Sequence, residues 1–122
     1  MSIIFTKPSV AQSSSNVSNR TLFQVPANSN QIIGSVPINI TQSVKWWITV
    51  TDPNTGKIFS YNITAINMVT DTRHVISNIV GDTFAHNCDV YIMGGTHMVL
   101  EITNNIANTI DIRIKQDNNI SI

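Results

Sequence analysis

The stretch "SVKWWITVTDPNTGKIFSYNITA", residues 43–65, decides the fold class, because apolar and polar residues alternate on both sides of a turn signal. Alternation with a period of two is typical of a strand that buries one face. The intervening "PNTG", residues 53–56, contains the Pro, Asn and Gly that type I turns favour. Residues 43–65 therefore predict a β-hairpin.

The parity of the apolar residues sets the register of this hairpin. A slip of one residue would turn a whole apolar set toward water, so the two apolar sets must face each other. This condition leaves residues 53–56 as a four-residue loop. The predicted pairs are Val50 with Phe59, Ile48 with Tyr61, and Trp46 with Ile63.

The two adjacent tryptophans must then point to opposite faces of the sheet. Trp46 belongs to the core, and Trp47 lies on the outer face among polar residues, namely Lys45, Thr49, Thr51, Ser60, Asn62 and Thr64. A large aromatic side chain on such a face usually contacts another subunit, a sugar or a segment of its own chain. We therefore select Trp47, Lys45, Thr49 and Asn62 as a candidate interaction surface. Simple coverage of Trp47 by residues 1–19 or by a loop is the alternative.

Short apolar stretches recur along the rest of the chain at a spacing of about ten residues, with turn signals between them. This pattern, rich in β-branched residues, predicts an all-β fold: a single antiparallel β-sandwich of jelly-roll or Ig-like type with seven or eight short strands. The expected strands are residues 20–25, 31–36, 43–51, 58–66, 74–80, 87–93, 97–103 and 109–115.

The same parity argument predicts a three-stranded meander near the C-terminus. A "GGT" loop, residues 94–96, and the segment "NNIAN", residues 104–108, separate its strands. The expected pairs are Ile92 with Met98, Val90 with Leu100, Ile102 with Ile110, and Leu100 with Ile112. On its solvated face, opposite charges could meet among Glu101, Asp111, Arg113 and Lys115.

Residues 1–19 lack sustained periodicity and contain the loop-like "AQSSSNVSN". We expect an N-terminal arm over residues 1–19, flexible or docked on a neighbour, followed by one domain over residues 20–122. The candidate anchoring residues of the arm are Ile3, Ile4, Phe5 and Pro8. The start "MSIIFTKPSV" is too weakly apolar for a signal peptide, so we expect a soluble protein without a cleaved leader.

Charge does not indicate a nucleic-acid or membrane partner. Charged residues make up 11% of the 122-residue chain, and seven basic residues balance seven acidic ones. We therefore expect neither nucleic acid nor membrane among the partners.

Few residues indicate chemistry. His86 and Cys88 bring two potential metal ligands close together, with His74 and His97 elsewhere, but a zinc site needs three or four converging ligands. Cys88 as a nucleophile would need a base and an orienting carboxylate, and Asp89 lies on the other side of the strand. We predict no catalytic residue, no metal site and no cofactor.

The order "IIGSVPINITQSVKWWITVTD", a polar turn, "GKIFSYNITAIN", "VISNIVGDTFAHNCDVYIMGGTHMVLEIT" and "IDIRIKQ" resembles a β-sandwich module of tailed-bacteriophage virion proteins. The resemblance covers residues 31–116. The matching positions are Val36, Pro37, Lys45, Trp46, Gly94, Gly95, Leu100, Ile102, Ile112 and Ile114.

This resemblance implies a non-enzymatic structural protein of the virion, made in the cytoplasm of the bacterial host. We expect a capsid decoration protein that binds other virion proteins of the capsid, neck or tail and forms a homo-oligomer such as a trimer. The alternative is a carbohydrate- or receptor-binding module of a phage tail or fibre, with Trp47 stacking on a glycan.

Overall fold

The computed structural model describes residues 20–68, 70–82 and 85–120, which contain eight β-strands and no helix. The N-terminal arm, with Ile3, Ile4, Phe5 and Pro8, lies outside the described residues. The strands are β2 (Arg20–Val25), β3 (Ser29–Pro37), β4 (Thr41–Asp52), β5 (Lys57–Asn67), β6 (Thr72–Gly81), β7 (His86–Met93), β8 (His97–Asn104) and β9 (Ile110–Ile120). Each of the eight predicted strands is present.

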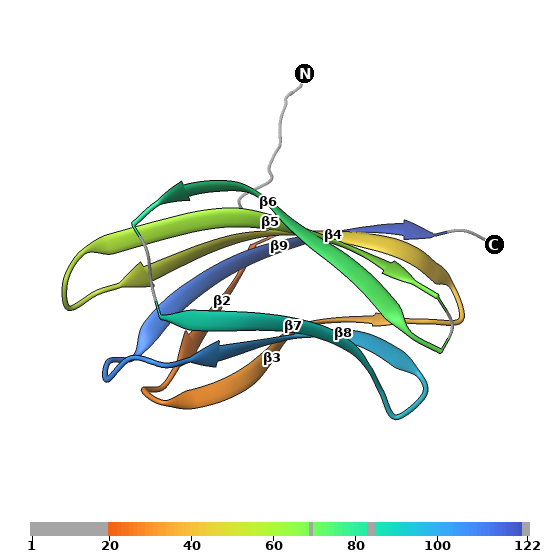
Figure 1. The fold of residues 1–122 in the computed structure, drawn as a ribbon, viewed down its shortest axis with the longest axis horizontal. Helices are drawn as coiled ribbons and strands as arrows, with labels where there is room; N and C mark the ends of the chain where they lie inside the picture. The colour runs from red at the N-terminus through yellow and green to blue at the C-terminus, as the bar shows by residue number, and fades with distance from the viewer. Residues whose placement is uncertain (1–19, 69, 83–84, 121–122) are drawn as a thin grey trace, which may run out of the picture.

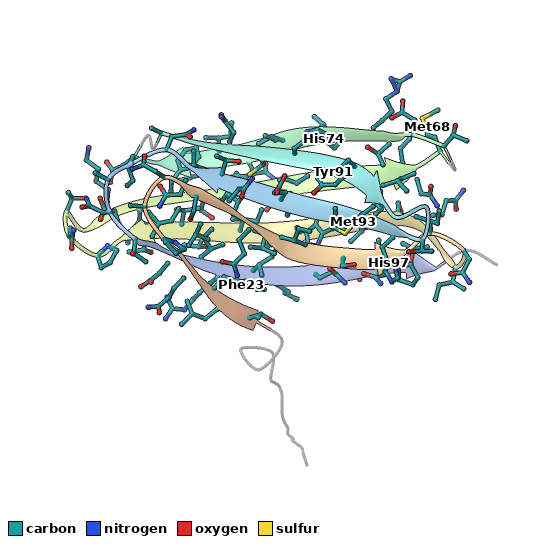
Figure 2. The ribbon with its side chains drawn as sticks, turned by 90° about the horizontal axis from the view of Figure 1, so that it is seen from below. Phe23, Met68, His74, Tyr91, Met93 and His97 are labelled. Atoms are coloured by element: carbon teal, nitrogen blue, oxygen red, sulfur yellow. The ribbon has the colours of Figure 1, made fainter. Side chains whose placement is uncertain are left out.

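The strands form two antiparallel sheets that face each other across one core (Figure 1). The larger sheet has the order β2-β9-β4-β5-β6, and the smaller has the order β3-β8-β7. In the view of Figure 2, β6 runs along one margin of the molecule near β7, and β2 runs along the other near β3. The smaller sheet therefore covers the larger one from one margin to the other.

Both predicted hairpin registers are confirmed. In the β4–β5 hairpin, Val50 lies opposite Phe59 and Trp46 opposite Ile63. In the β7–β8 hairpin, Ile92 lies opposite Met98. Asp52 shapes the first turn, because its two carboxylate oxygens accept hydrogen bonds from the Asn54 backbone N–H at 3.0 Å and from the Thr55 hydroxyl at 3.0 Å.

The predicted C-terminal meander is wrong, because β8 and β9 belong to different sheets. Ile102 pairs with Gln31 and Cys88 rather than with Ile110, and Ile112 pairs with Phe23 and Val50 rather than with Leu100. The segment after β8 crosses from the smaller sheet to the larger one. Glu101 is consequently separated from the other charged residues with which it was expected to share a face, namely Asp111, Arg113 and Lys115.

The core fills the space between the two sheets. Trp46 is fully buried there and is the largest buried side chain. The other fully buried large side chains come from both sheets: Ile48, Ile63, Met98, Leu100, Ile102, Ile110, Ile112, Val25, Val36, Val44 and Val50. This shared burial, rather than any backbone pairing between the sheets, holds the two layers together.

At each end of the molecule, the side chain of one asparagine links the loops between strands by hydrogen bonds. The Asn104 amide donates to the carbonyls of Val25 (3.1 Å), Pro26 (3.0 Å) and Asn108 (2.8 Å), and its oxygen accepts from Ile106 N–H at 3.0 Å. These bonds satisfy backbone groups that the crossing loops would otherwise bury unpaired. At the opposite end, the Asn67 amide donates to the carbonyls of Ile38 at 2.9 Å and Thr41 at 3.1 Å.

Candidate functional sites

Trp47 lies on the outer face of β4, the central strand of the five-stranded sheet, as the sequence predicted. It is directly opposite Asn62 on β5, and Lys115 on β9 flanks it on the other side. The ammonium groups of Lys45 and Lys115 lie over its ring, 5.1 and 5.2 Å from the centroid, within the range of cation–π attraction. The selected residues Trp47, Lys45, Thr49 and Asn62 are therefore brought together on one face.

Sequence reasoning missed how apolar this outer face is. Cross-strand partners point to the same side of a sheet, so the registers of the five strands assign further side chains to the face of Trp47. They include exposed aliphatic residues: Leu22, Ile58, Ile66, Val75 and Val80. We call these five residues and Trp47 the outer patch. The outer patch therefore makes this face more apolar than the sequence of β4 and β5 alone had predicted.

Basic residues outnumber acidic ones among the described side chains of the outer face. The registers place Lys45, Arg73, Arg113 and Lys115 there, together with the carboxylates Asp111 and Asp117, and Asp82 lies beside Ile58 of the same face. Within this face, the Asp111 carboxylate accepts a hydrogen bond of 3.3 Å from the Gln24 side-chain amide. An acidic and partly apolar surface would complement this face best.

A second cluster of polar groups lies inside the molecule, where β5 faces β7. The Tyr61 hydroxyl lies 3.0 Å from Nε2 of His86 and 2.8 Å from Sγ of Cys88. His86 also packs its ring against Phe59 and Tyr61, with centroids 5.6 and 5.7 Å apart. The structure thus joins the His86 and Cys88 pair that the sequence singled out, and adds Tyr61, which the sequence had assigned only to the core.

Burial sets the protonation states in this cluster. It raises the pKa of the Cys88 thiol and of the Tyr61 phenol, because the charged forms lose their hydration, and the hydrogen bond between the two groups only partly offsets the rise for Cys88. Burial lowers the pKa of His86 for the same reason. The directions of these shifts favour the neutral form of all three groups at pH 7, so the thiolate form of Cys88 is scarce.

The remaining histidines lie apart from this cluster. Figure 2 labels His74 on β6 and His97 at the start of β8, and His97 Nδ1 is within 2.9 Å of the Thr96 hydroxyl. Within the described ranges, no three residues of the types His, Cys, Asp or Glu gather into a group that could hold a metal ion.

A hollow of about 620 Å³ opens at the end of the molecule where the β3–β4 connection meets the β7–β8 turn. Ile38, Asn67 and Thr96 are among its lining residues. Its polar groups mainly join the loops to one another, since Ile38 N–H donates to the Thr96 carbonyl at 3.0 Å and Asn67 bridges Ile38 and Thr41.

No protein-family model and no curated protein matches this chain. Over residues 20–68, 70–82 and 85–120, no helix has the length and apolar character needed to cross a membrane.

Proposed function

We propose that this chain is a non-enzymatic structural protein of a phage virion, made in the host cytoplasm, that decorates the capsid by docking through the outer face of its five-stranded sheet. The observation that carries the docking is Trp47, which lies on the central strand of that face with two lysine ammonium groups over its ring. Tryptophan and cationic side chains at the centre of a partly apolar surface are typical of protein interfaces.

The partner surface is acidic and partly apolar. It presents carboxylates to Lys45 and Lys115 and an apolar area to Trp47 and Leu22, which is 51% exposed. When such a surface docks, Trp47 becomes desolvated while its cation–π contacts are retained. A capsid protein with this surface chemistry is the occupant that we propose.

The virion assignment is supported by the sequence pattern of residues 31–116, from "IIGSVP" to the terminal "IDIRI" strand. We also propose that the two sheets form a β-sandwich of jelly-roll or Ig-like type. Four connections change sheets, namely those after β2, β3, β6 and β8, and such crossings are typical of Greek-key sandwiches.

The proposal is tested on purified particles from the phage or prophage that encodes the chain. We expect mass spectrometry to find the protein on wild-type particles, and particles from a deletion strain to assemble but break at lower temperature. Purified wild-type protein should co-sediment with the deletion particles and restore their heat resistance. Absence of the protein from wild-type particles would refute the proposal.

Two variants test the docking face. Trp47→Ala and Leu22→Lys should each reduce co-sedimentation by about tenfold or more, because they remove an apolar contact or bury an unpaired charge at the interface. Met93→Lys is a matched control, since Met93 is 40% exposed but lies on β7 in the other sheet. If Met93→Lys weakened docking while the two outer-face variants bound normally, the docking face would be wrong.

Carbohydrate binding at Trp47 is the second candidate, favoured by Asn62 directly opposite the ring and by Thr49 nearby. A sugar stacking on the indole must compete with the two lysine side chains over it, which makes this candidate the weaker one. Binding of wild type but not of Trp47→Ala to a glycan array would establish the sugar site. If neither protein bound any glycan on the array, this candidate function would be eliminated.

A further inference from the structure

Strand β6 is the last strand of the larger sheet in the described part of the chain, and its large apolar side chains are exposed. Four are substantially exposed: Val75 (58%), Ile76 (41%), Ile79 (60%) and Val80 (66%). Sheet edges that remain solvated usually carry charged residues or prolines, which block pairing with another strand. Within Thr72–Gly81, only Arg73 carries such a charge.

A bulge divides β6 into two halves. Asn62 pairs with Ser77, but Ser60 pairs with Val80, so the two residues Asn78 and Ile79 lie opposite the single residue Tyr61. Asn78, within the bulge, has a φ of 55°, in the left-handed region. Because of this extra residue, the outward-facing positions change from odd numbers before the bulge, such as Arg73 and Val75, to even numbers after it, such as Val80.

We propose that β6 pairs with β6 of a second copy of this chain, antiparallel and about a two-fold axis, so that the two five-stranded sheets become one continuous sheet. A two-fold contact uses the same surface on both copies and must therefore be self-complementary. The inference does not depend on the proposed virion function, since it uses the edge of the sheet rather than Trp47.

One register satisfies this requirement. If Arg73 lies opposite Asp82 of the second copy, Val75 lies opposite Val80 and Ile76 opposite Ile79. Because of the bulge, the two side chains of each pair point to the same face of the sheet. The two-fold axis makes every pair occur twice in the dimer. A shift of one residue would oppose side chains from different faces, and a shift of two would place Val80 opposite Ser77 and Ile76 opposite Gly81.

Residues of opposite charge lie at the two ends of β6. Asp82 follows β6 directly, and its backbone N–H donates to the Ile58 carbonyl at 2.8 Å while its carboxylate accepts from Ile58 N–H at 3.2 Å. This bond directs one carboxylate oxygen, Oδ2, toward β5, so the contact with Arg73 of the second copy would be made by the other oxygen, Oδ1. Arg73 is exposed at the other end of β6 and is paired across the sheet with Ile66.

The seam would also cover a small hollow on the inner side of β6. Ile76 and Ile79 line this hollow of about 190 Å³ together with Phe59, Tyr61, His86 and Cys88. In the proposed register, Ile76 of each copy contacts Ile79 of the other at its mouth. The pairing thus removes apolar surface from water on both faces of the sheet at once.

The test is the native mass of the full-length protein, measured by light scattering after size exclusion and by sedimentation over a range of concentrations. We expect a monomer–dimer equilibrium. Val80→Lys should shift the protein to monomer. Leu22→Lys is a matched change of an exposed aliphatic residue on β2, at the other end of the strand order in the described part of the sheet, and it should leave the dimer intact. A wild type that is monomeric at every concentration would overturn the proposal, as would an oligomer that Val80→Lys does not affect.

A charge exchange tests the register. Arg73→Asp alone should weaken the dimer by about tenfold, because it opposes two carboxylates at both ends of the seam. Asp82→Arg alone should weaken it similarly. The double variant Arg73→Asp/Asp82→Arg places opposite charges together again and should recover most of the affinity. Failure of the double variant to recover, although it is folded by circular dichroism, would refute this register.

Because Leu22→Lys impairs particle docking but not the dimer, and Val80→Lys disrupts the dimer, the two proposals can fail separately. Hydrogen exchange provides a second readout with unmodified protein: amides of residues 72–82 should become more protected as the concentration rises. Exchange that is independent of concentration while the mass is dimeric would place the contact elsewhere.

Discussion

The indole N–H of Trp46 donates a hydrogen bond of 2.8 Å to the side-chain oxygen of Gln116, its direct neighbour on β9. The bond satisfies the only polar atom of the largest buried side chain, so the ring is held in one orientation in the core. The Gln116 amide in turn donates to the Ser35 carbonyl on β3 at 3.5 Å. One glutamine therefore links both sheets at the position of Trp46.

The two tryptophans should differ sharply in their contribution to stability. Trp46→Ala should reduce the free energy of unfolding by about 3–5 kcal/mol, because it empties a fully buried site. Trp47→Ala should cost only about 1 kcal/mol, mainly from the lost contacts with Lys45 and Lys115. Urea unfolding at one fixed protein concentration measures both values, and equal costs would contradict this assignment of the two faces.

Gly34 should not tolerate a side chain. A Cβ atom at this position would lie 2.6 Å from Nε1 and 2.9 Å from Cε2 of Trp46. Gly34→Ala should therefore cost about 1–3 kcal/mol by overpacking, whereas Ser35→Ala, at the exposed neighbour, should stay within about 0.5 kcal/mol. A double-mutant cycle with Trp46→Phe checks the cause, because the smaller ring should make Gly34→Ala less costly.

Asn104 should matter far more than its neighbour Asn105. Asn104→Ala leaves the carbonyls of Val25, Pro26 and Asn108 without their side-chain donor and should cost about 1–3 kcal/mol. Asn105→Ala, at an exposed position, should change stability by less than about 0.5 kcal/mol. Thermal unfolding of the two variants side by side measures the difference, and similar melting temperatures would show that the crossing loops do not depend on Asn104.

His86 should make the protein less stable in mild acid. Since burial lowers its pKa in the folded state, the unfolded chain binds the proton more readily than the folded one. The contribution of neutral His86 is fully present above its ordinary pKa of 6.5 and is lost as the pH falls through the lower folded value. Urea unfolding from pH 7.5 downward should show this loss in wild type and in His74→Gln, but a smaller slope in His86→Gln.

Cys88 should react slowly with thiol reagents. Burial raises the pKa of its thiol, so the reactive thiolate is scarce at pH 7, and the sulfur is held against the Tyr61 hydroxyl. We expect a reaction with a disulfide reagent at least about tenfold slower than that of free cysteine, and normal reactivity in urea. Rapid modification of the native protein would contradict a neutral, buried thiol.

The sequence could predict the pairings that a short turn enforces. Residues 53–56 and 94–96 are short turns that bring consecutive strands side by side, so parity alone gave the registers of β4 with β5 and of β7 with β8. Trp47 was correctly placed on the outer face by the same reasoning. In these hairpins, local turn chemistry and the apolar pattern agree on a single register.

The sequence could not decide between pairing within a sheet and packing across the core. Leu100 and Ile112 point into the core in either arrangement, so their pattern fits both the predicted meander and the observed crossing to another sheet. The buried Asn104 amide stabilises the observed crossing, and its carbonyl partners at Val25 and Pro26 are remote in sequence. The Tyr61–Cys88 contact was missed for the same reason, because it joins strands of different sheets.

The pairing of β2 with β9 brings together the beginning and the end of the described chain. Gln24 and Asp111, hydrogen-bonded in this pair, are 87 residues apart in sequence. During synthesis, β2 leaves the ribosome long before its partner β9 is made. Strand β4 likewise cannot pair along its second edge until β9 is made. The larger sheet can therefore form only after β9 has been synthesised, and contacts of such long range are typical of slow folding.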